Sequence, residues 1–299
     1  MHKGTILATS QGKQVINCKT CGYTHVNPLP TQTELDDFYL KSFYQDVKTS
    51  YFEDYERDHD WWALNYNWLL DDLVNLLSSK KPVDKIRLLD IGSGPGLFLK
   101  CAKDKGIQAI GIEPSKEAFK YSRKKHNVDV LNVTLENMDQ TVEKYDIVHS
   151  SLVMEHILNP LEYIKKSKKM LKKGGLLCII VPNDFNPIQT INVKLGCKQW
   201  WVSPFEHLNY FNSKSLRGLV EKAGLQVVNE SVTFPIDLFL LFNKNYLNNS
   251  TLGQECHFMR KSFEFNIEKT SSDKFRKDLY KAFFKLGVGR ELVMIAKKK

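Results

Sequence analysis

The sequence predicts an α/β fold in which a mostly parallel sheet is covered by helices on both faces. From residue 87 onward, short apolar runs alternate with amphipathic segments of helical spacing. A glycine-rich turn joins the first apolar run to the first amphipathic segment. The 299 residues, of which 42% are hydrophobic and 26% charged, suffice for one large globular domain with additions.

Seven apolar runs are the expected strands, and each has the length of a buried strand. They cover residues 87–91, 109–112, 128–131, 145–149, 176–181, 225–233 and 291–296. Helical spacing is found between them, at residues 97–105, 115–126, 161–171 and 214–222. Ser213 is the expected cap of the last helix, and Gly174 and Gly175 are expected to end the third. Alternation of this kind predicts a seven-stranded, mostly parallel sheet.

Three additions to this core are expected. Residues 1–30 contain two strand candidates around a turn, which predict a small hairpin or knuckle. Residues 31–80 predict helices that cover the ligand site, one capped by Thr33 and one beginning near Asp58. The core is assigned to residues 81–299, with a substrate loop at 183–213 and a helical insertion at 235–285.

The composition argues against a secreted or membrane-spanning chain. Residues 1–14 lack the apolar core of a signal peptide. The most apolar later run, at 236–242, is far shorter than the roughly 20 residues that cross a bilayer. We therefore expect a cytoplasmic protein with reduced cysteines and no membrane span. The net charge of +9 fits solvated helix faces, with an anionic partner as the alternative.

The turn after the first expected strand has the pattern of a nucleotide-binding site. It reads DIGSGPG from Asp90 to Gly96, and glycines let the backbone approach a ligand because no Cβ intervenes. The turn also directs the N-terminus of the next helix at that ligand. Its third glycine comes one position earlier than in dinucleotide-binding proteins. Glu113 ends the second expected strand, where a carboxylate can accept hydrogen bonds from both ribose hydroxyls.

These residues resemble the first two motifs of class I S-adenosylmethionine-dependent methyltransferases, which have a Rossmann-like sheet. The resemblance implies that S-adenosylmethionine is the cofactor and that Asp90 holds its methionine end. It further implies that Gly92, Ser93 and Gly94 form the floor of the site. A nicotinamide-binding fold or a chance glycine turn is the alternative.

Further residues match this family by position. The resemblance assigns the ribose to Glu113 and the adjoining Pro114. Leu135 would pack on the adenine ring and Glu136 would meet its edge, unless this segment is only a surface loop. Ser151, after the fourth expected strand, would face the reactive sulfonium.

More narrowly, the whole chain resembles methyltransferases found with bacterial surface-carbohydrate genes. The residues that carry this likeness are Cys18–Gly22, Asn27–Pro30, Phe205–Phe211, Glu221–Gly224 and Gly287–Glu291. The likeness implies a small-molecule acceptor and favours a hydroxyl of a sugar or a sugar-nucleotide, with nitrogen or carbon as the alternative methylated atom. The acceptor could be phosphorylated. An RNA methyltransferase is an alternative, although the Asn/Asp-Pro-Pro-aromatic and Pro-Cys motifs of nucleic-acid enzymes are missing from the expected positions. A catalytically silent adenosylmethionine-binding protein is the other alternative.

His207 is the expected catalytic residue. Methyl transfer proceeds by in-line displacement, and a hydroxyl acceptor must also lose a proton to a general base. His207 follows the fifth expected strand, at the edge of the sheet where ligands bind in open α/β folds. The alternative is that His207 only bonds a loop carbonyl.

Two other segments could contact a substrate. Trp200 and Trp201 could stack on a sugar ring or pack in the protein. The basic stretch 256–261 could bind a phosphate, but its pattern favours a solvated helix face.

Cys18 and Cys21 have the spacing of a zinc-binding pair. A structural zinc needs four ligands, and here His2 and His25 would have to complete the set. We therefore expect a packed knuckle without a metal, with zinc as the alternative. The sequence also shows no clear magnesium-binding set.

Overall fold

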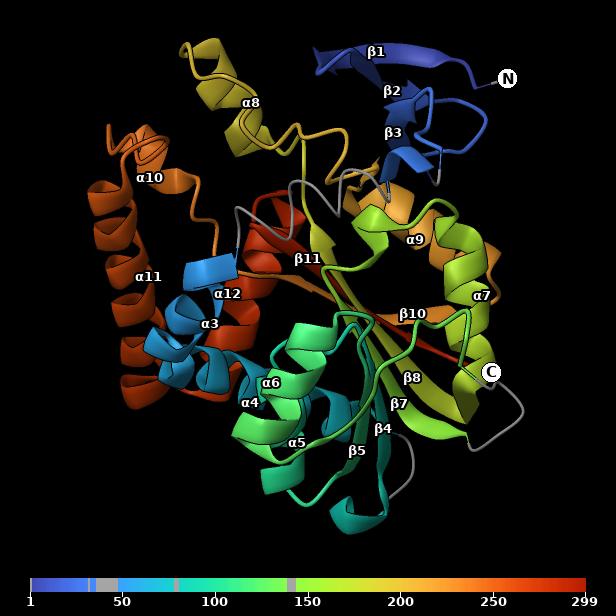
Figure 1. Cartoon of the computed structure of the whole chain (residues 1–299). Coiled ribbons are helices and arrows are strands. Elements are labelled where there is room, and N and C mark those ends of the chain that lie inside the picture. The colour runs from blue at the N-terminus through green and yellow to red at the C-terminus, as the bar shows by residue number, and fades with distance from the viewer. Residues whose placement is uncertain (1, 32, 36–47, 78–80, 139–143) are drawn as a thin grey trace.

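A seven-stranded sheet forms the centre of the computed structural model, which describes residues 2–31, 33–35, 48–77, 81–138 and 144–299 (Figure 1). The strand order is β10-β11-β8-β7-β4-β5-β6. In this sheet β11 runs in the opposite direction to the other six strands, which share one direction. The predicted α/β class, with a mostly parallel sheet, is therefore confirmed. The strands are β4 (Arg87–Ile91), β5 (Gln108–Ile112), β6 (Asp129–Leu131), β7 (Tyr145–Ser151), β8 (Leu171–Pro182), β10 (Gln226–Val232) and β11 (Glu291–Lys297).

Helices cover both faces of this sheet, as the alternating pattern predicts. The helices α7 (Pro160–Met170) and α9 (Ser213–Lys222) pack on one face, and α4 (His59–Leu76) and α5 (Leu97–Asp104) pack together on the other. The helix α6 (Lys116–His126) lies next to β6. Successive side chains of a strand point to opposite faces, so both faces of the buried strands are apolar.

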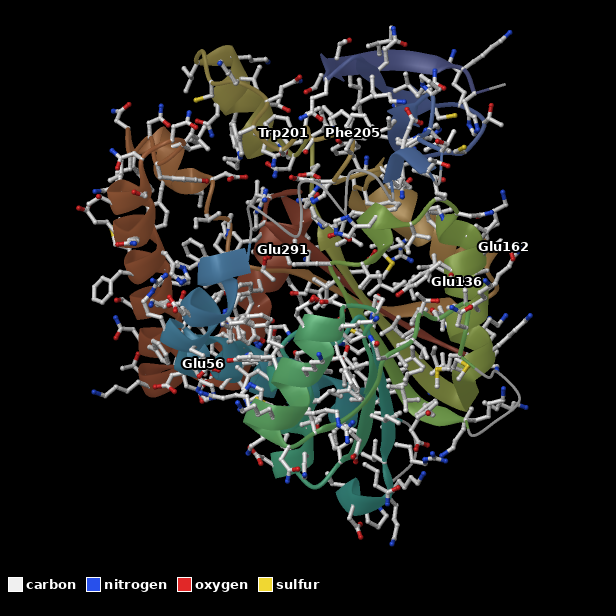
Figure 2. All side chains as sticks on the ribbon, viewed as in Figure 1. Glu56, Glu136, Glu162, Trp201, Phe205 and Glu291 are labelled. Atoms are coloured by element: carbon white, nitrogen blue, oxygen red, sulfur yellow. The ribbon has the colours of Figure 1, made fainter. Side chains whose placement is uncertain are left out.

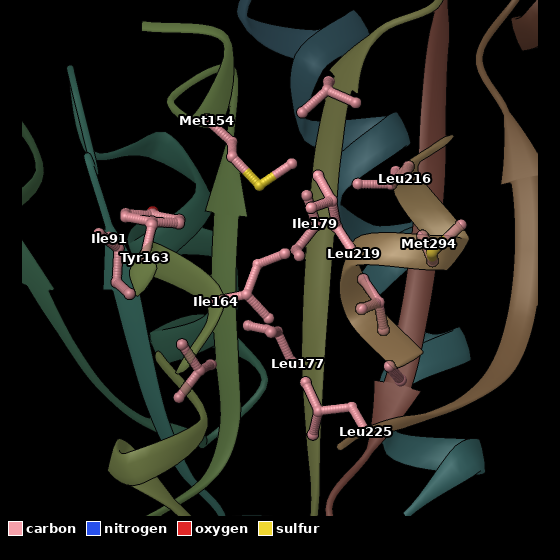
Figure 3. Close-up of a cluster of buried hydrophobic side chains, with 14 of the residues drawn as sticks. Ile91, Met154, Tyr163, Ile164, Leu177, Ile179, Leu216, Leu219, Leu225 and Met294 are labelled. Atoms are coloured by element: carbon pink, nitrogen blue, oxygen red, sulfur yellow. The ribbon is translucent and has the colours of Figure 1, made fainter. Parts of the chain in front are cut away.

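The core under α7 and α9 shows this alternation clearly. Figure 3 shows Leu177 and Ile179 of β8 directed at side chains of these two helices, including Ile164 and Leu216. The intervening Cys178 belongs to the cluster on the opposite face. Each fully buried side chain of this size stabilises the fold by about 1.5–3 kcal/mol.

Two local predictions in this region are wrong. The cap of α9 is Asn212 rather than Ser213, because the Asn212 side chain accepts a hydrogen bond from the Ser215 backbone N–H. Gly174 and Gly175 do not separate α7 from β8, since the strand already begins at Leu171 and includes both glycines. The Gly174 N–H donates to the Lys298 carbonyl at 2.7 Å, which holds the glycines in the sheet.

The N-terminal strands form a second, four-stranded sheet in the order β1-β2-β3-β9. The expected hairpin is present as β1 (Gly4–Ser10) and β2 (Lys13–Cys18), and it is extended by β3 (Thr24–Asn27) and β9 (Asn209–Tyr210). The last strand comes from the segment 183–213, which also contains α8 (Pro187–Lys194). Residues 4–27 and 183–213 are therefore joined in one small unit.

Trp201 packs inside that small unit. Its side chain is buried with Ala8, Val15 and Val26, and Trp200 packs beside this cluster. Figure 2 shows Trp201 between α8 and the N-terminal strands. Packing in the protein is therefore the role that the structure gives to Trp201.

Further helices flank the sheet on the α4 side. They are α3 (Lys48–Arg57), α10 (Leu238–Leu241), α11 (Ser250–Thr270) and α12 (Asp273–Lys285), with short 3₁₀ turns at Val83–Lys85 (η2) and Met154–His156 (η3). The last three α-helices lie in the expected insertion 235–285, and α4 confirms the helix expected from Asp58. Of the helix expected after Thr33, residues 33–35 are helical and Phe38 and Tyr39 lie outside the described residues. Among the described helices, none has the length and apolar character to cross a bilayer.

Candidate active site

A pocket of about 430 Å³ opens at the carboxyl ends of the central strands. One half is lined by the turn after β4 and by the end of β7, including Asp90, Gly92 and Ser151. The other half is lined by α4, α11, α12, β10 and β11. Its volume and its mixture of aromatic and polar groups are typical of a small-molecule site.

The glycine turn leaves no room for side chains. Gly92 has φ +73°, and a Cβ placed there would lie 2.5 Å from Cγ2 of Val153. The N–H groups of Gly92 and Ser93 both donate to the Ile112 carbonyl, at 2.9 and 3.1 Å, which holds the turn against β5. Backbone in this turn can therefore approach a bound ligand closely, as the sequence predicts.

Asp90 and His149 form a buried pair on adjacent strands. Asp90 of β4 stands opposite His149 of β7 in the parallel register, and His149 Nδ1 lies 2.7 Å from Asp90 Oδ1. An ionised carboxylate only accepts hydrogen bonds, so Nδ1 is the donor. The imidazole also stacks on Phe98, with ring centroids 3.9 Å apart.

Two buried polar atoms in this half have no protein partner among the described residues. They are Nε2 of His149 and Oγ of Ser93, and both residues line the pocket. Buried polar atoms are normally satisfied, so these two point to a ligand with polar groups. The ammonium, carboxylate and hydroxyl groups of S-adenosylmethionine fit that requirement.

The Glu113 side chain binds the backbone of the glycine turn. Its buried carboxylate accepts a hydrogen bond from Gly94 N–H at one oxygen and from Ser115 N–H at the other, both at 2.8 Å. A carboxylate has further lone pairs, so it can also accept from a ribose. Glu113 thus ties the end of β5 to the turn after β4.

The predicted cofactor residues separate into two groups. Asp90, Gly92, Ser93, Gly94 and Ser151 line the pocket, whereas Glu113, Pro114, Leu135 and Glu136 are not among its lining residues. Leu135 is buried in the core, and the exposed Glu136 lies 3.7 Å from Lys166. Figure 2 shows Glu136 beside α7. The adenine roles of Leu135 and Glu136 stay predictions.

An aromatic wall from α4 lines the other half of the pocket. Trp61, Trp62, Tyr66 and Trp68 all contribute to it. Trp61 Nε1 donates to Glu264 of α11, and Trp68 Nε1 donates to Glu268 of the same helix at 2.6 Å. The indole rings are therefore held in place by carboxylates from about 200 residues away in the chain.

Two arginines from the insertion also face this half. Arg260 of α11 lies over Trp61, with its guanidinium carbon 4.1 Å from the ring centroid, and Arg276 of α12 lies over Trp68 at 4.7 Å. The Arg276 guanidinium pairs with Asp273, at 2.5 Å. The Nε atom of Arg260 is buried without a hydrogen-bond partner among the described residues.

The basic stretch 256–261 is therefore not a solvated helix face. His257 Nε2 lies 2.7 Å from Asp58 Oδ2, and Lys261 Nζ lies 2.5 Å from Asp58 Oδ1. These contacts attach α11 to the start of α4. The interpretation favoured by the sequence is wrong for these basic side chains, because α4 packs against this side of α11, Asp58 pairs with His257 and Lys261, and Trp61 contacts Arg260.

Glu291 brings a carboxylate from the first residue of β11 into the pocket. Since β11 is antiparallel to β8, its first residue pairs with Pro182 at the carboxyl end of that strand. Thr233 donates its hydroxyl to Glu291. Burial raises the pKa of Glu291, against the opposing effect of the Arg290 charge. Figure 2 shows Glu291 near the upper end of the sheet.

Comparison with known proteins decides the family. A model described as a methyltransferase domain matches residues 62–230, more than half of the chain. The chain belongs to the methyltransferase domain family. The predicted enzyme class and cofactor are confirmed, because this family match agrees with curated relatives named as methyltransferases and with solved structures of S-adenosylmethionine-dependent methyltransferases.

Curated relatives match about half of this methyltransferase. A ubiquinone biosynthesis O-methyltransferase from Cereibacter sphaeroides is 30% identical over 163 residues, which are 51% of this chain and 65% of the relative. One of the same name from Pelagibacter ubique is 30% identical over 132 residues, or 42% of this chain and 55% of the relative. The chain thus spans less than two thirds of each relative.

A solved structure shares the fold. An S-adenosylmethionine-dependent methyltransferase from Archaeoglobus fulgidus matches with a TM-score of 0.51 and 17% identity, covering 83% of this chain and 100% of that chain. These relatives are named for methyl transfer or for ubiquinone, so the resemblance to surface-carbohydrate enzymes stays an interpretation.

His207 lies in a charged cluster of this methyltransferase and is not among the residues that line the described pocket. Its Nδ1 atom is 3.9 Å from Oδ2 of Asp184, and its ring packs edge-on against His156. Burial lowers the pKa of His207, but Asp184 and the nearby Glu155 outweigh this effect and raise the pKa overall.

Sequence reasoning missed His149, Glu264 and Glu291. The sequence signal that could have found His149 is a polar residue within an apolar strand. In the structure His149 stands opposite Asp90 on the neighbouring strand. Glu264 and Glu291 carried no such signal, because charged residues at the start of a strand or on a helix are normally solvated.

Proposed function

We propose that this methyltransferase transfers the methyl group of S-adenosylmethionine to a hydroxyl of a sugar or a sugar-nucleotide. The observation that carries the proposal is the second half of the pocket, where an aromatic wall and several hydrogen-bonding groups face the same space. Sugars present both apolar ring faces and a rim of hydroxyls, so they suit such a surface. Asn65, Glu264 and Glu291 line the pocket and carry hydrogen-bonding atoms for hydroxyls. Asn65 Nδ2 also donates to Glu264 at 3.2 Å, which orients these two side chains.

Arg260 supports an anionic or strongly polar acceptor. Its Nε donor has no partner among the described residues, and its guanidinium is held over Trp61. Guanidinium groups bind phosphates and carboxylates with two parallel hydrogen bonds. A phosphate that links a sugar to a nucleotide would therefore find a donor here, while the sugar ring lies against α4.

S-adenosylmethionine, when bound, supplies a methyl group on a positively charged sulfur. Asp90 and the glycine turn would hold its methionine end, and Glu113 its ribose. The enzyme's main task is to hold the acceptor hydroxyl in line with that methyl group while water is excluded, which can lower the barrier by about 7–11 kcal/mol. The tryptophans of α4 would exclude water on the acceptor side.

Glu291 is the group that we assign to the acceptor proton. It lines the pocket, it stands at the carboxyl edge of the sheet, and burial raises its pKa. A carboxylate with a raised pKa is a stronger base than an ordinary one. His207, the base that the sequence predicts, is the competing candidate.

An aromatic hydroxyl is the second candidate acceptor. It is favoured by the aromatic wall of α4 and by the name of the curated relatives, which are ubiquinone biosynthesis O-methyltransferases. A phenol would stack on the indoles without needing the hydrogen bonds of Asn65 and Arg260. The two acceptors therefore differ in which side chains they need.

Transfer of a tritiated methyl group to a panel of acceptors tests the proposal. The panel contains nucleotide-sugars, free sugars, a catechol and bulk tRNA. We expect label in the nucleotide-sugar or sugar fraction, with mass spectrometry locating the methyl group on oxygen. Label in the catechol alone would support the second candidate, and label in tRNA alone would contradict both.

Two variants decide between the candidate bases. We expect Glu291→Gln to lower kcat by about a hundredfold, because the proton acceptor is lost. We expect His207→Ala to keep kcat within about twofold, since this side chain is not among the lining residues of the pocket. Binding of S-adenosylhomocysteine, measured by calorimetry, should be unchanged in both. The opposite order of the two kcat values would assign the proton to His207.

A further inference from the structure

Four potential metal ligands meet at the base of the N-terminal sheet, outside the pocket. They are His2, Cys18, Cys21 and His25, and one ligand atom of each lies within 4.8 Å of the others. His2 Nδ1 is 3.6 Å from Cys18 Sγ and 3.2 Å from Cys21 Sγ. Around a tetrahedral zinc, neighbouring nitrogen and sulfur ligands are about 3.3–3.8 Å apart, given Zn–N and Zn–S bonds of about 2.0 and 2.3 Å.

His25 is already prepared as a ligand. Its Nδ1 atom lies 2.7 Å from the Val26 carbonyl oxygen, which can only accept, so Nδ1 carries the hydrogen. Nε2 is then an unprotonated lone pair, and it is buried without a hydrogen-bond partner among the described residues. A metal-bound histidine characteristically donates its other ring N–H to a carbonyl or carboxylate, which is the arrangement seen here.

The backbone brings the four side chains together. A tight turn closes after β2, where Gly22 N–H donates to the Cys18 carbonyl at 2.9 Å. Lys19 N–H donates to the Lys3 carbonyl at 3.0 Å, which places the residue before Lys3, His2, beside this turn. The His2 and His25 rings meet edge to face, with centroids 4.8 Å apart.

We propose that these residues bind a structural zinc ion as a Cys₂His₂ site, in place of the metal-free knuckle that the sequence favours. Four protein ligands close the coordination shell, so the ion would stabilise structure and take no part in methyl transfer. The site would fasten the start of β1 to the turn between β2 and β3. Because β3 pairs with β9, the ion would also fix the segment 183–213 against the N-terminal sheet.

Metal analysis of the full chain tests this proposal. The protein is purified without an N-terminal tag, because His2 is a ligand, and zinc is measured by mass spectrometry after dialysis. We expect about one zinc per chain, and less than a tenth of that in His2→Ala and Cys21→Ser. Cys197→Ser is the matched control, because Cys197 is also a half-buried free thiol but lies outside the cluster.

Cobalt substitution gives a second readout that does not depend on any variant folding. Co²⁺ added to zinc-depleted wild-type protein should give the visible bands of a tetrahedral site and the near-ultraviolet band of a thiolate ligand. Protein that retains no zinc and shows no such bands with Co²⁺ would overturn the proposal. Full zinc content and an unchanged Co²⁺ spectrum in His2→Ala would overturn the four-ligand assignment.

Discussion

The two halves of the pocket are built in different ways. The half around the glycine turn comes from β4, the turn that follows it and the adjacent strand β7, and it includes the polar pair of Asp90 and His149. The acceptor half is made of side chains whose positions are fixed across the chain, as in the contact of Trp61 with Glu264, 203 residues later. In the proposed function, the cofactor would thus meet a local and regular structure, whereas the acceptor would meet side chains brought together from distant parts of the chain.

Glu113→Ala should have the largest effect and should be confined to the cofactor half. The variant loses the acceptor of the Gly94 and Ser115 N–H groups and the proposed ribose contact. Hydrogen bonds to a charged group contribute about 1.5–3 kcal/mol each, so S-adenosylhomocysteine should bind at least about a hundredfold more weakly. Calorimetry measures this, with Glu162→Ala, an exposed glutamate on α7, as the control. Normal affinity in Glu113→Ala would refute the ribose role.

Arg260→Met should have a smaller effect, confined to the acceptor half. Methionine keeps an apolar stem over Trp61 but removes the guanidinium donors. We expect the KM for the methylated acceptor to rise about tenfold, the loss of about one charged hydrogen bond, with unchanged affinity for S-adenosylhomocysteine. Lys274→Met, at an exposed position of α12, is the control. A rise in the cofactor dissociation constant instead would show that the two halves are not separable.

Glu155→Gln should leave both halves of the pocket unchanged and should act on stability alone. Burial raises the pKa of Glu155 to about 8, whereas in the unfolded chain the pKa is about 4.5. The folded protein therefore holds a proton that the unfolded chain releases, and stability from this group falls as the pH rises from about 5 to 8. The glutamine variant lacks this dependence, which amounts to about 4 kcal/mol over three pH units, so its Tm should fall about 6–8 °C less over that range. Glu162→Gln should behave like the wild type, and an identical Tm profile for Glu155→Gln would contradict the expectation.

The comparison of the two halves also explains what the sequence could predict. The strands 87–91 and 109–112 and the glycines between them follow from local periodicity, and the structure places them within a residue of the prediction. The strands β3 and β9 were not predicted, because a two-residue strand such as β9 exists only through its partner, 182 or more residues earlier. In the sequence, Arg260 and Glu264 have the pattern of an ordinary solvated helix face, because no neighbouring residue indicates that α4 covers this face.

The position of β11 also bears on how the protein is made. This strand lies between β10 and β8 although it follows both in the chain, so neither of them has its full set of partners until residues 291–297 have been synthesised. Until then, β8 and β10 present open edges, which are templates for association between chains. A chain cut before Glu291 should therefore accumulate as aggregates, and would lack part of the pocket wall even where it stayed in solution.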